Sequence, residues 1–197
     1  MPQRPDSALP AIALPRPLAS KGYGLRPARS SDRDFERRLF ESARPDAAVL
    51  AGWPAATRGA FLDQQFQFQT AHYAGEYPHA ERLIVTAKGA PVGRLIVERA
   101  GLPWQIVDIA LLPSSRRRGL GGALLDAVLA AAACAAAEVA LTVEQGNPAR
   151  GLYERFGFTV TAIAPPHLAM LWRPLRGVGS MQDRPAGDET RPGDGAP

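Results

Sequence analysis

The sequence has few of the residues that form disulfides or bind metals. Its 197 residues include one cysteine, Cys134, and three histidines, His72, His79 and His167, which lie far apart. A single cysteine excludes a disulfide framework and a cysteine-rich zinc site, and the histidine spacing matches no metal-binding motif. We therefore expect no metal cofactor and, because lone free thiols are typical of reducing compartments, a cytoplasmic protein.

Long hydrophobic runs are also missing. The longest, Ala127–Ala137, has eleven residues, whereas a membrane-spanning helix needs about 18 or more. Near the N-terminus, Pro10 and Pro15 interrupt a short apolar stretch, which is unlike the helical core of a secretion signal. The sequence therefore predicts neither a membrane partner nor secretion.

Lysine is scarce, with two among the 23 basic residues, and the net charge is +4. A basic chain can bind nucleic acid, but the arginines are spread along the sequence and only Arg116–Arg118 form a run. The abundance of arginine, alanine, glycine and proline indicates a compositional bias. We predict no nucleic-acid partner. Binding of nucleic acid through the arginine run is the weaker alternative, which a steep salt dependence would reveal.

The two ends of the chain differ from its middle. Residues 1–22 are proline-rich and aperiodic, which predicts a flexible leader. Residues 177–197 have hardly any large apolar side chain and cannot bury enough surface to fold, which predicts a disordered tail. Residues 23–173 remain as a single domain, long enough to bury a proper core.

Within this domain, strand and helix patterns alternate. Strands are expected at 23–28, 82–87, 91–99, 106–112, 138–143, 158–164 and 167–172. Helices are expected after the capping residues Ser31 and Asp32, and over 57–73, 119–137 and 148–156. This order indicates an α/β (α+β) fold around a mixed sheet. On the helix 119–137, an apolar stripe should face the sheet and consists of Leu120, Leu124, Ala127, Ala131 and Cys134, so we expect Cys134 to be a small core residue.

Residues 106–125, IVDIALLPSSRRRGLGGALL, carry the strongest functional signal. An apolar strand ends at Pro113, an arginine-rich loop follows, and Gly119, Gly121 and Gly122 open a helix. The first N–H groups of a helix lack internal partners and carry the positive end of its dipole, and glycines let these amides approach a phosphate. The phosphate-loop and dinucleotide glycine motifs are not met, because no lysine follows the glycines and Leu124 occupies the third glycine position. The segment therefore predicts a pyrophosphate site of another kind.

The pattern R-x-x-G-x-G at residues 116–121, after an apolar strand, resembles the coenzyme loop of the GNAT superfamily of acyl-CoA-dependent N-acyltransferases. Residues 144–158 resemble the family's next signature, carried here by Asn147, Tyr153, Gly157 and Phe158. Residues 25–32, LRPARSSD, resemble its first strand and helix start. The resemblance covers about residues 22–173. It implies a mixed, mostly antiparallel central sheet flanked by helices, with splayed central strands.

The resemblance also implies acetyl-CoA as the co-substrate and a primary amine, on a small molecule or a protein, as the acceptor. It implies direct attack in a ternary complex. The strand would bond the pantetheine and the loop the pyrophosphate, which assigns coenzyme binding to Ile109, Ala110, Leu111, Arg116, Arg117, Arg118, Gly119, Leu120, Gly121, Gly122, Asn147 and Tyr153. A homodimer through the last strands is suggested by the resemblance alone.

Two catalytic residues are predicted. Tyr153 would donate a proton to the leaving thiolate, since a phenol with a pKa of about 10 is protonated at pH 7. Packing within a short helix is its alternative role. The resemblance implies a glutamate early in the strand before the loop, where this chain has Gln105. Asp108, which interrupts the apolar strand, is then the predicted base, and a hydrogen bond within the sheet or a pair with an arginine is an equal alternative.

Other assignments stay open. Glu144 or a water chain could replace Asp108 as the base. The acceptor pocket is expected to draw its walls from Trp53, Phe61, Phe66, Phe68, His72 and Tyr73. Gln105 in place of the glutamate supports an alternative function, a coenzyme A-binding or assembly protein without turnover.

Overall fold

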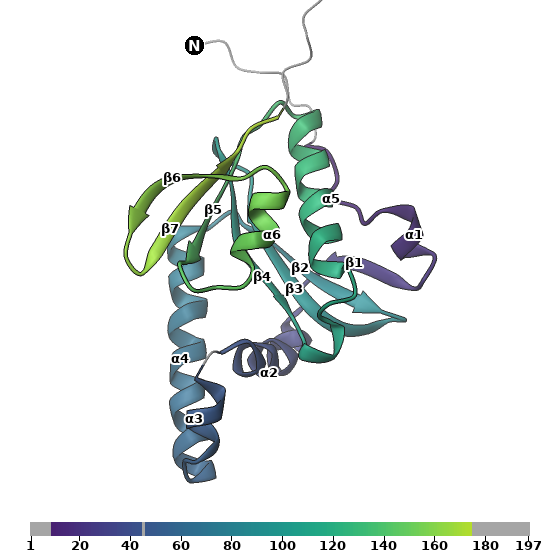
Figure 1. Cartoon of the computed structure of the whole chain (residues 1–197). Helices are drawn as coiled ribbons and strands as arrows, with labels where there is room; N and C mark the ends of the chain where they lie inside the picture. The colour runs from purple at the N-terminus through teal and green to yellow at the C-terminus, as the bar shows by residue number, and fades with distance from the viewer. Residues whose placement is uncertain (1–8, 45, 175–197) are drawn as a thin grey trace, which may run out of the picture.

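The computed structural model describes residues 9–44 and 46–174 (Figure 1). The predicted tail and the first eight residues of the predicted leader lie outside the described residues. The strands are β1 Tyr23–Pro27, β2 Glu81–Ala87, β3 Ala90–Glu98, β4 Trp104–Leu111, β5 Val139–Glu144, β6 Thr159–Ala164 and β7 His167–Trp172. The α-helices are α1 Arg16–Ala19, α2 Arg33–Ala43, α3 Ala47–Ala51, α4 Ala55–Glu76, α5 Leu120–Cys134 and α6 Arg150–Arg155.

The strands form one sheet in the order β1-β2-β3-β4-β5-β7-β6. All neighbouring strands are antiparallel except β4 and β5, which run parallel. The parallel pair is connected through α5, as a parallel crossover requires. The predicted fold class, a mixed and mostly antiparallel sheet flanked by helices, is therefore confirmed.

The parallel pair is joined over only a short stretch. Trp104, Gln105 and Ile106 of β4 lie opposite residues 139–141 of β5. Beyond this point, β4 continues to Leu111 and β5 to Glu144 without pairing to each other. Figure 1 shows the two strands diverging near α6. This is the splay of the central strands that the resemblance implied.

Each face of the sheet has its own apolar cluster. α5 packs on one face, where Leu120, Leu124 and Val128 join the main core with Leu95 and Ile106. α2 packs on the other face, where its residues Phe35 and Leu39 surround Ile84 of β2. Because side chains alternate between the two faces along each strand, each face of the sheet packs against its own layer of helices.

The prediction for Cys134 is wrong. Its side chain is exposed, although Ala131 is buried as expected. At 3.6 residues per turn, the next core position after Ala131 falls on Ala135, which packs against the main cluster. Cys134 therefore turns to solvent at the end of α5.

Residues 9–22, the described part of the predicted leader, lie against the sheet. Ile12, Leu14 and Leu18 pack on the main core, and the Arg99 guanidinium donates to the Pro10 carbonyl at 2.6 Å. The short helix α1 carries Leu18. A helix of four residues, one of them a proline, gives no helical periodicity, so the sequence showed no sign of this contact.

The helix α4 is longer than its predicted range 57–73 and contains the alternating segment QFQFQ. Phe66 is buried, whereas Phe68 is 61% exposed, because positions two apart lie on different sides of a helix. No helix in the described part of the chain is long and apolar enough to cross a membrane.

Candidate active site

The first amides of α5 are not capped. Gly119 precedes the helix with a φ of 78°, a left-handed conformation that suits glycine, and no described side chain caps the helix. The first regular backbone bond of α5 joins the Ala123 N–H to the Gly119 carbonyl at 3.0 Å. The N–H groups of Leu120, Gly121 and Gly122 are therefore left for solvent or a ligand at the positive end of the helix dipole.

The three arginines before α5 differ in their contacts: one is anchored to the protein backbone and two are exposed. The Arg116 guanidinium donates to the Leu111 carbonyl at 2.9 Å and to the Ser42 carbonyl at 3.0 Å, so it ties the loop to the ends of β4 and α2. Arg117 and Arg118 are exposed, and Arg117 has a φ of 58°. Only these two side chains extend from the loop surface without such an anchoring contact.

The end of β4 has one unpaired edge. Ile109, Ala110 and Leu111 pair with β3 on one side, and they lie beyond the last residue that pairs with β5. Their other backbone edge faces the gap between the splayed strands. An extended ligand arm could hydrogen-bond to this edge as an additional strand would.

A β-bulge in β4 determines where Asp108 points. Ile106 lies opposite Val97 of β3 and Asp108 opposite Ile96, so Val107 is an extra residue. Ile106 packs in the cluster under α5. Without the bulge, strand alternation would send Asp108 to that same face, and the extra residue turns it to the face covered by α2.

On that face, Asp108 forms an ion pair with Arg94 of β3. Arg94 Nε and Nη2 lie 2.8 and 2.7 Å from Asp108 Oδ2. Arg94 is only 3% exposed. Its Nη1 lies 3.4 Å from Glu36 Oε1, and Nη2, which also contacts Asp108, lies 3.4 Å from Gln69 Oε1. The alternative in which Asp108 pairs with an arginine is thus observed, and nothing in the residue pattern pointed to Arg94 as the partner.

Tyr153 lies on α6, close enough to Asp108 for the two side chains to interact electrostatically. Burial, followed by the negative charge of Asp108, raises the pKa of Tyr153 to about 12. Its ring packs edge-on against Phe158, with 5.9 Å between the ring centroids. The phenol is therefore protonated at neutral pH, and the side chain also has the packing contacts that we considered as its alternative role.

Asn147 is engaged with its own segment. Its Oδ1 accepts a hydrogen bond from the Ala149 N–H at 2.8 Å, and α6 begins only at Arg150, later than predicted. Gly157, with a φ of 89°, ends this helix as expected.

A pocket of about 410 Å³ opens beside the group formed by Asp108, Arg94 and Gln69. Phe40, Ala43, Arg44, Asp46, Gln69 and Glu144 line it. Gln69 connects the pocket to Arg94, and Glu144 ends β5 at the splay. Arg44 and Asp46 neutralise each other through two hydrogen bonds of 2.7 and 2.6 Å.

The structure brings together only some of the residues that were predicted to line the acceptor pocket. Tyr73 is half-buried, and burial, followed by the charge of Asp108, raises its pKa to about 12. Trp53 stacks on Phe61, with 5.3 Å between their rings, while Phe68 and His72 are exposed. Of these aromatic residues, Tyr73 is the one that shares the surroundings of Asp108.

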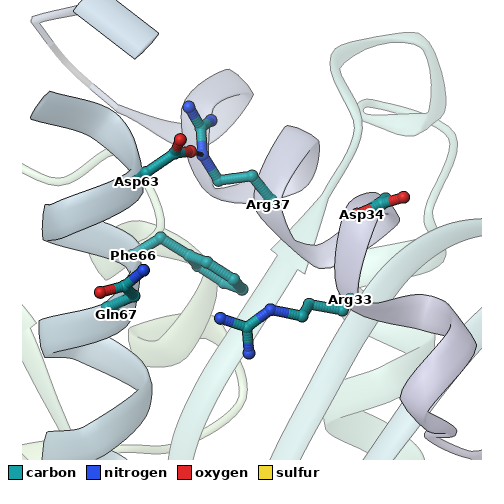
Figure 2. A pocket seen from close by; sticks show the side chains of 6 residues that line it. All are labelled: Arg33, Asp34, Arg37, Asp63, Phe66 and Gln67. Carbon is teal, nitrogen blue, oxygen red and sulfur yellow. Dashed lines mark hydrogen bonds and ion pairs between the residues drawn. The ribbon is translucent and has the colours of Figure 1, made fainter. Parts of the chain in front are cut away.

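A second pocket, of about 240 Å³, lies between α2 and α4 (Figure 2). Arg37 pairs there with Asp63 at 2.6 Å, and the Arg33 guanidinium lies 5.8 Å from the centre of the Phe66 ring. Phe66 is the only predicted site residue among those that line it. We therefore place the candidate active site at the splay and not in this pocket.

Comparison with known proteins agrees with this geometry. Residues 78–160 match the family model described as "Acetyltransferase (GNAT) domain". This range holds β2 to β5, the glycine loop, α5 and α6. No curated protein matches the sequence.

Solved structures of similar fold come from several organisms. The PaiA N-acetyltransferase of Thermoplasma acidophilum in complex with coenzyme A matches with a TM-score of 0.59 and 13% identity, over 77% of this chain and 98% of that one. The ribosomal-protein-S18-alanine N-acetyltransferase of Escherichia coli matches with a TM-score of 0.55 and 19% identity, over 80% and 97%. A GNAT family acetyltransferase of Elizabethkingia anophelis with acetyl-CoA bound matches with a TM-score of 0.50 and 13% identity, over 77% and 98%.

The splayed mixed sheet and the glycine-rich start of α5 match the fold of these solved acetyltransferase structures. Residues 78–160 carry the match to the GNAT acetyltransferase domain, in agreement with the resemblance of the motifs.

Proposed function

We propose that the protein is an N-acetyltransferase that moves the acetyl group of acetyl-CoA to a primary amine by direct attack in a ternary complex. One observation carries this proposal. The uncapped amides of α5 lie next to the unpaired edge of β4, in the gap that its splay from β5 leaves. A diphosphate and an extended thioester arm require this combination of an anion site and a free strand edge.

The residues at the loop fit the coenzyme. Leu120, Gly121 and Gly122 offer free N–H groups, and no described atom lies within 4 Å of the place where a Cβ on Gly119 would stand. Arg117 and Arg118 add positive charge, while Arg116 holds the loop in position. Ile109–Leu111 would bond the pantetheine through their backbone. The coenzyme A complex of the similar Thermoplasma acidophilum protein supports this assignment.

The residues at the splay supply the proton transfers. In the transfer, a bond forms between the amine nitrogen and the acetyl carbon, and the carbon–sulfur bond breaks. Asp108 would accept the proton that the amine loses, and Tyr153 would donate a proton to the leaving sulfur. The products are an acetylated amine and free coenzyme A. The amine would enter through the 410 Å³ pocket that ends at Gln69 and Glu144.

The first test is binding of acetyl-CoA, measured by thermal shift. At 100 times its Kd, a ligand stabilises the folded state by about 2.7 kcal/mol. We expect the double variant Arg117→Glu/Arg118→Glu to bind acetyl-CoA at least tenfold more weakly. The variant Arg38→Glu, which reverses an exposed charge on α2, should bind like the unaltered protein. No shift at millimolar acetyl-CoA would refute the proposal.

The second test is turnover, followed by release of free thiol with a panel of primary amines. A specific observation favours the alternative of a coenzyme A-binding protein without turnover, because the predicted base is held in a partly buried ion pair with Arg94. Binding of acetyl-CoA without thiol release from any amine would support that alternative. The cytoplasmic location and the homodimer through the last strands stay predictions.

A further inference from the structure

We propose that Arg94 is a positioning residue, which fixes the Asp108 carboxylate and aims one of its oxygens at the amine. The proposal rests on the function proposed above, in which Asp108 is the base. It adds a residue that is distant from the coenzyme loop in sequence.

The first argument is the geometry of the ion pair. Arg94 directs Nε and Nη2, at 2.8 and 2.7 Å, to the same oxygen, Oδ2 of Asp108. No hydrogen bond from a described residue reaches Oδ1. One oxygen of the carboxylate is therefore fixed, and the other is free to accept a proton. The planar guanidinium is suited to fixing a carboxylate in this way.

The second argument is that Arg94 is itself fixed. Its side chain is 4% exposed, and it lies between three acceptors from three elements: Asp108 of β4, Glu36 of α2 and Gln69 of α4. Arg82 of β2 pairs with the same Glu36 oxygen at 2.8 Å. Two arginines and two carboxylates therefore balance in charge, and the bulge at Val107 is what brings Asp108 into this group.

The third argument is the position of the group between the reacting centre and the acceptor pocket. Asp108 contacts Arg94 on β3 directly, and its charge reaches Tyr73 on α4 and Tyr153 on α6. Glu36 on α2 contacts Arg94 in turn, and Gln69 joins Arg94 to the wall of the acceptor pocket. Arg94 thus fixes the orientation of the acidic residue whose charge reaches both tyrosines.

The test compares kcat against pH for variants on both sides of Asp108. In Arg94→Met, loss of the positive charge favours the protonated carboxyl, so the acidic limb of kcat should move up by about 1 pH unit or more. In Glu36→Gln, loss of a competing negative charge should move the same limb down. Arg94→Lys keeps the charge but not the planar contacts, so kcat should fall about tenfold or more with a smaller shift of the limb.

The matched control is Arg99→Met. Arg99 follows β3, is paired with Glu81 and lies over the ring of Trp104, so its loss costs stability away from Asp108. Its pH profile should stay that of the unaltered protein. If Arg94→Met does not fold, Glu36→Gln and Arg94→Lys still decide the question, because both keep a positive charge beside Asp108.

A parallel titration of the Asp108 carboxyl carbon by ¹³C NMR makes the outcome independent of the acceptor. A move of this titration to higher pH in the Arg94 variants and to lower pH in Glu36→Gln supports the proposal. If neither the NMR titration of Asp108 nor the acidic limb of kcat moves in these variants, the proposal is overturned, even if the unaltered enzyme acetylates amines. Failure of the proposed function is recognised separately, by absence of the acetyl-CoA thermal shift or of thiol release in the unaltered protein.

Discussion

At the scale of single residues, the site brings an aspartate within electrostatic range of a tyrosine. Asp108 is tied to Arg94, and its negative charge adds to burial in raising the pKa of Tyr153 to about 12. A phenol with so high a pKa holds its proton at any pH the enzyme would work at. In the proposed mechanism, Tyr153 is therefore the proton donor, and the carboxylate of Asp108 is the proton acceptor.

Replacement of Tyr153 by phenylalanine tests this division of roles. We expect kcat to fall about 100-fold, because the variant loses the proton donor for the leaving sulfur. The melting temperature should change little, since no described residue hydrogen-bonds the hydroxyl and the ring contact with Phe158 remains. Steady-state kinetics and thermal melts measure both effects.

The control for this variant is Tyr77→Phe. Tyr77 lies at the end of α4, outside the proposed site, so its loss of a hydroxyl should leave kcat unchanged. Unchanged turnover in Tyr153→Phe with a good acceptor would remove Tyr153 from the mechanism.

At the scale of elements, the site depends on how closely β3 and β4 approach. A Cβ on Gly93 would stand 2.7 Å from the Ala110 carbonyl oxygen and 2.5 Å from a methyl carbon of Leu111. Such separations are well below ordinary contact. A glycine at this position of β3 therefore fixes where the free edge of β4 lies, and with it the width of the gap toward β5.

The variant Gly93→Ala should displace that edge. We expect the free energy of unfolding to fall by about 1–3 kcal/mol through overpacking, and acetyl-CoA to bind more weakly because the β4 backbone moves. Chemical denaturation and thermal shift measure these changes. Gly101→Ala, in the connection between the same two strands, is the control, because no described atom lies within 4 Å of its added methyl group. Equal effects of the two variants would contradict the assignment.

At the scale of the whole molecule, a partly buried ion pair ties the start of α2 to the edge strand β1. Arg26 of β1 binds Asp32 through two hydrogen bonds of 2.7 Å, just before α2. The Arg29 N–H donates to the same carboxylate at 2.8 Å. These bonds, with that to Arg26 the strongest, lower the pKa of Asp32 from 3.8 to about 2.

This pair predicts how stability depends on pH. Because the folded-state pKa of Asp32 lies below its unfolded value, its contribution is complete above about pH 4 and is lost as the pH falls toward 2. The loss should be about 2 kcal/mol. Urea unfolding across this range should show a flatter acid dependence for Asp32→Asn, whereas Asp34→Asn, an exposed change in the first turn of α2, should behave like the unaltered protein. A slope unaffected by Asp32→Asn would contradict this account.

Much of the fold could be predicted because its signals are local. Apolar periodicity and turn residues located all seven strands and the helices α2, α4, α5 and α6, with ends that differ by a few residues. The helices α1 and α3 were not predicted, since elements of four and five residues are too short for a periodicity. Asp32 was expected to cap α2, but its side chain caps nothing there and binds Arg26.

The sequence by itself determined the order of the elements and the glycine-rich opening of α5, because backbone conformation and unpaired amides follow from neighbouring residues. Only the tertiary structure decided the surroundings of Asp108. One extra residue in a strand reverses the face of every side chain after it, and the partners Arg94, Glu36 and Gln69 come from three elements that folding brings together. Their pairing depends on distances in space that no spacing along the chain records.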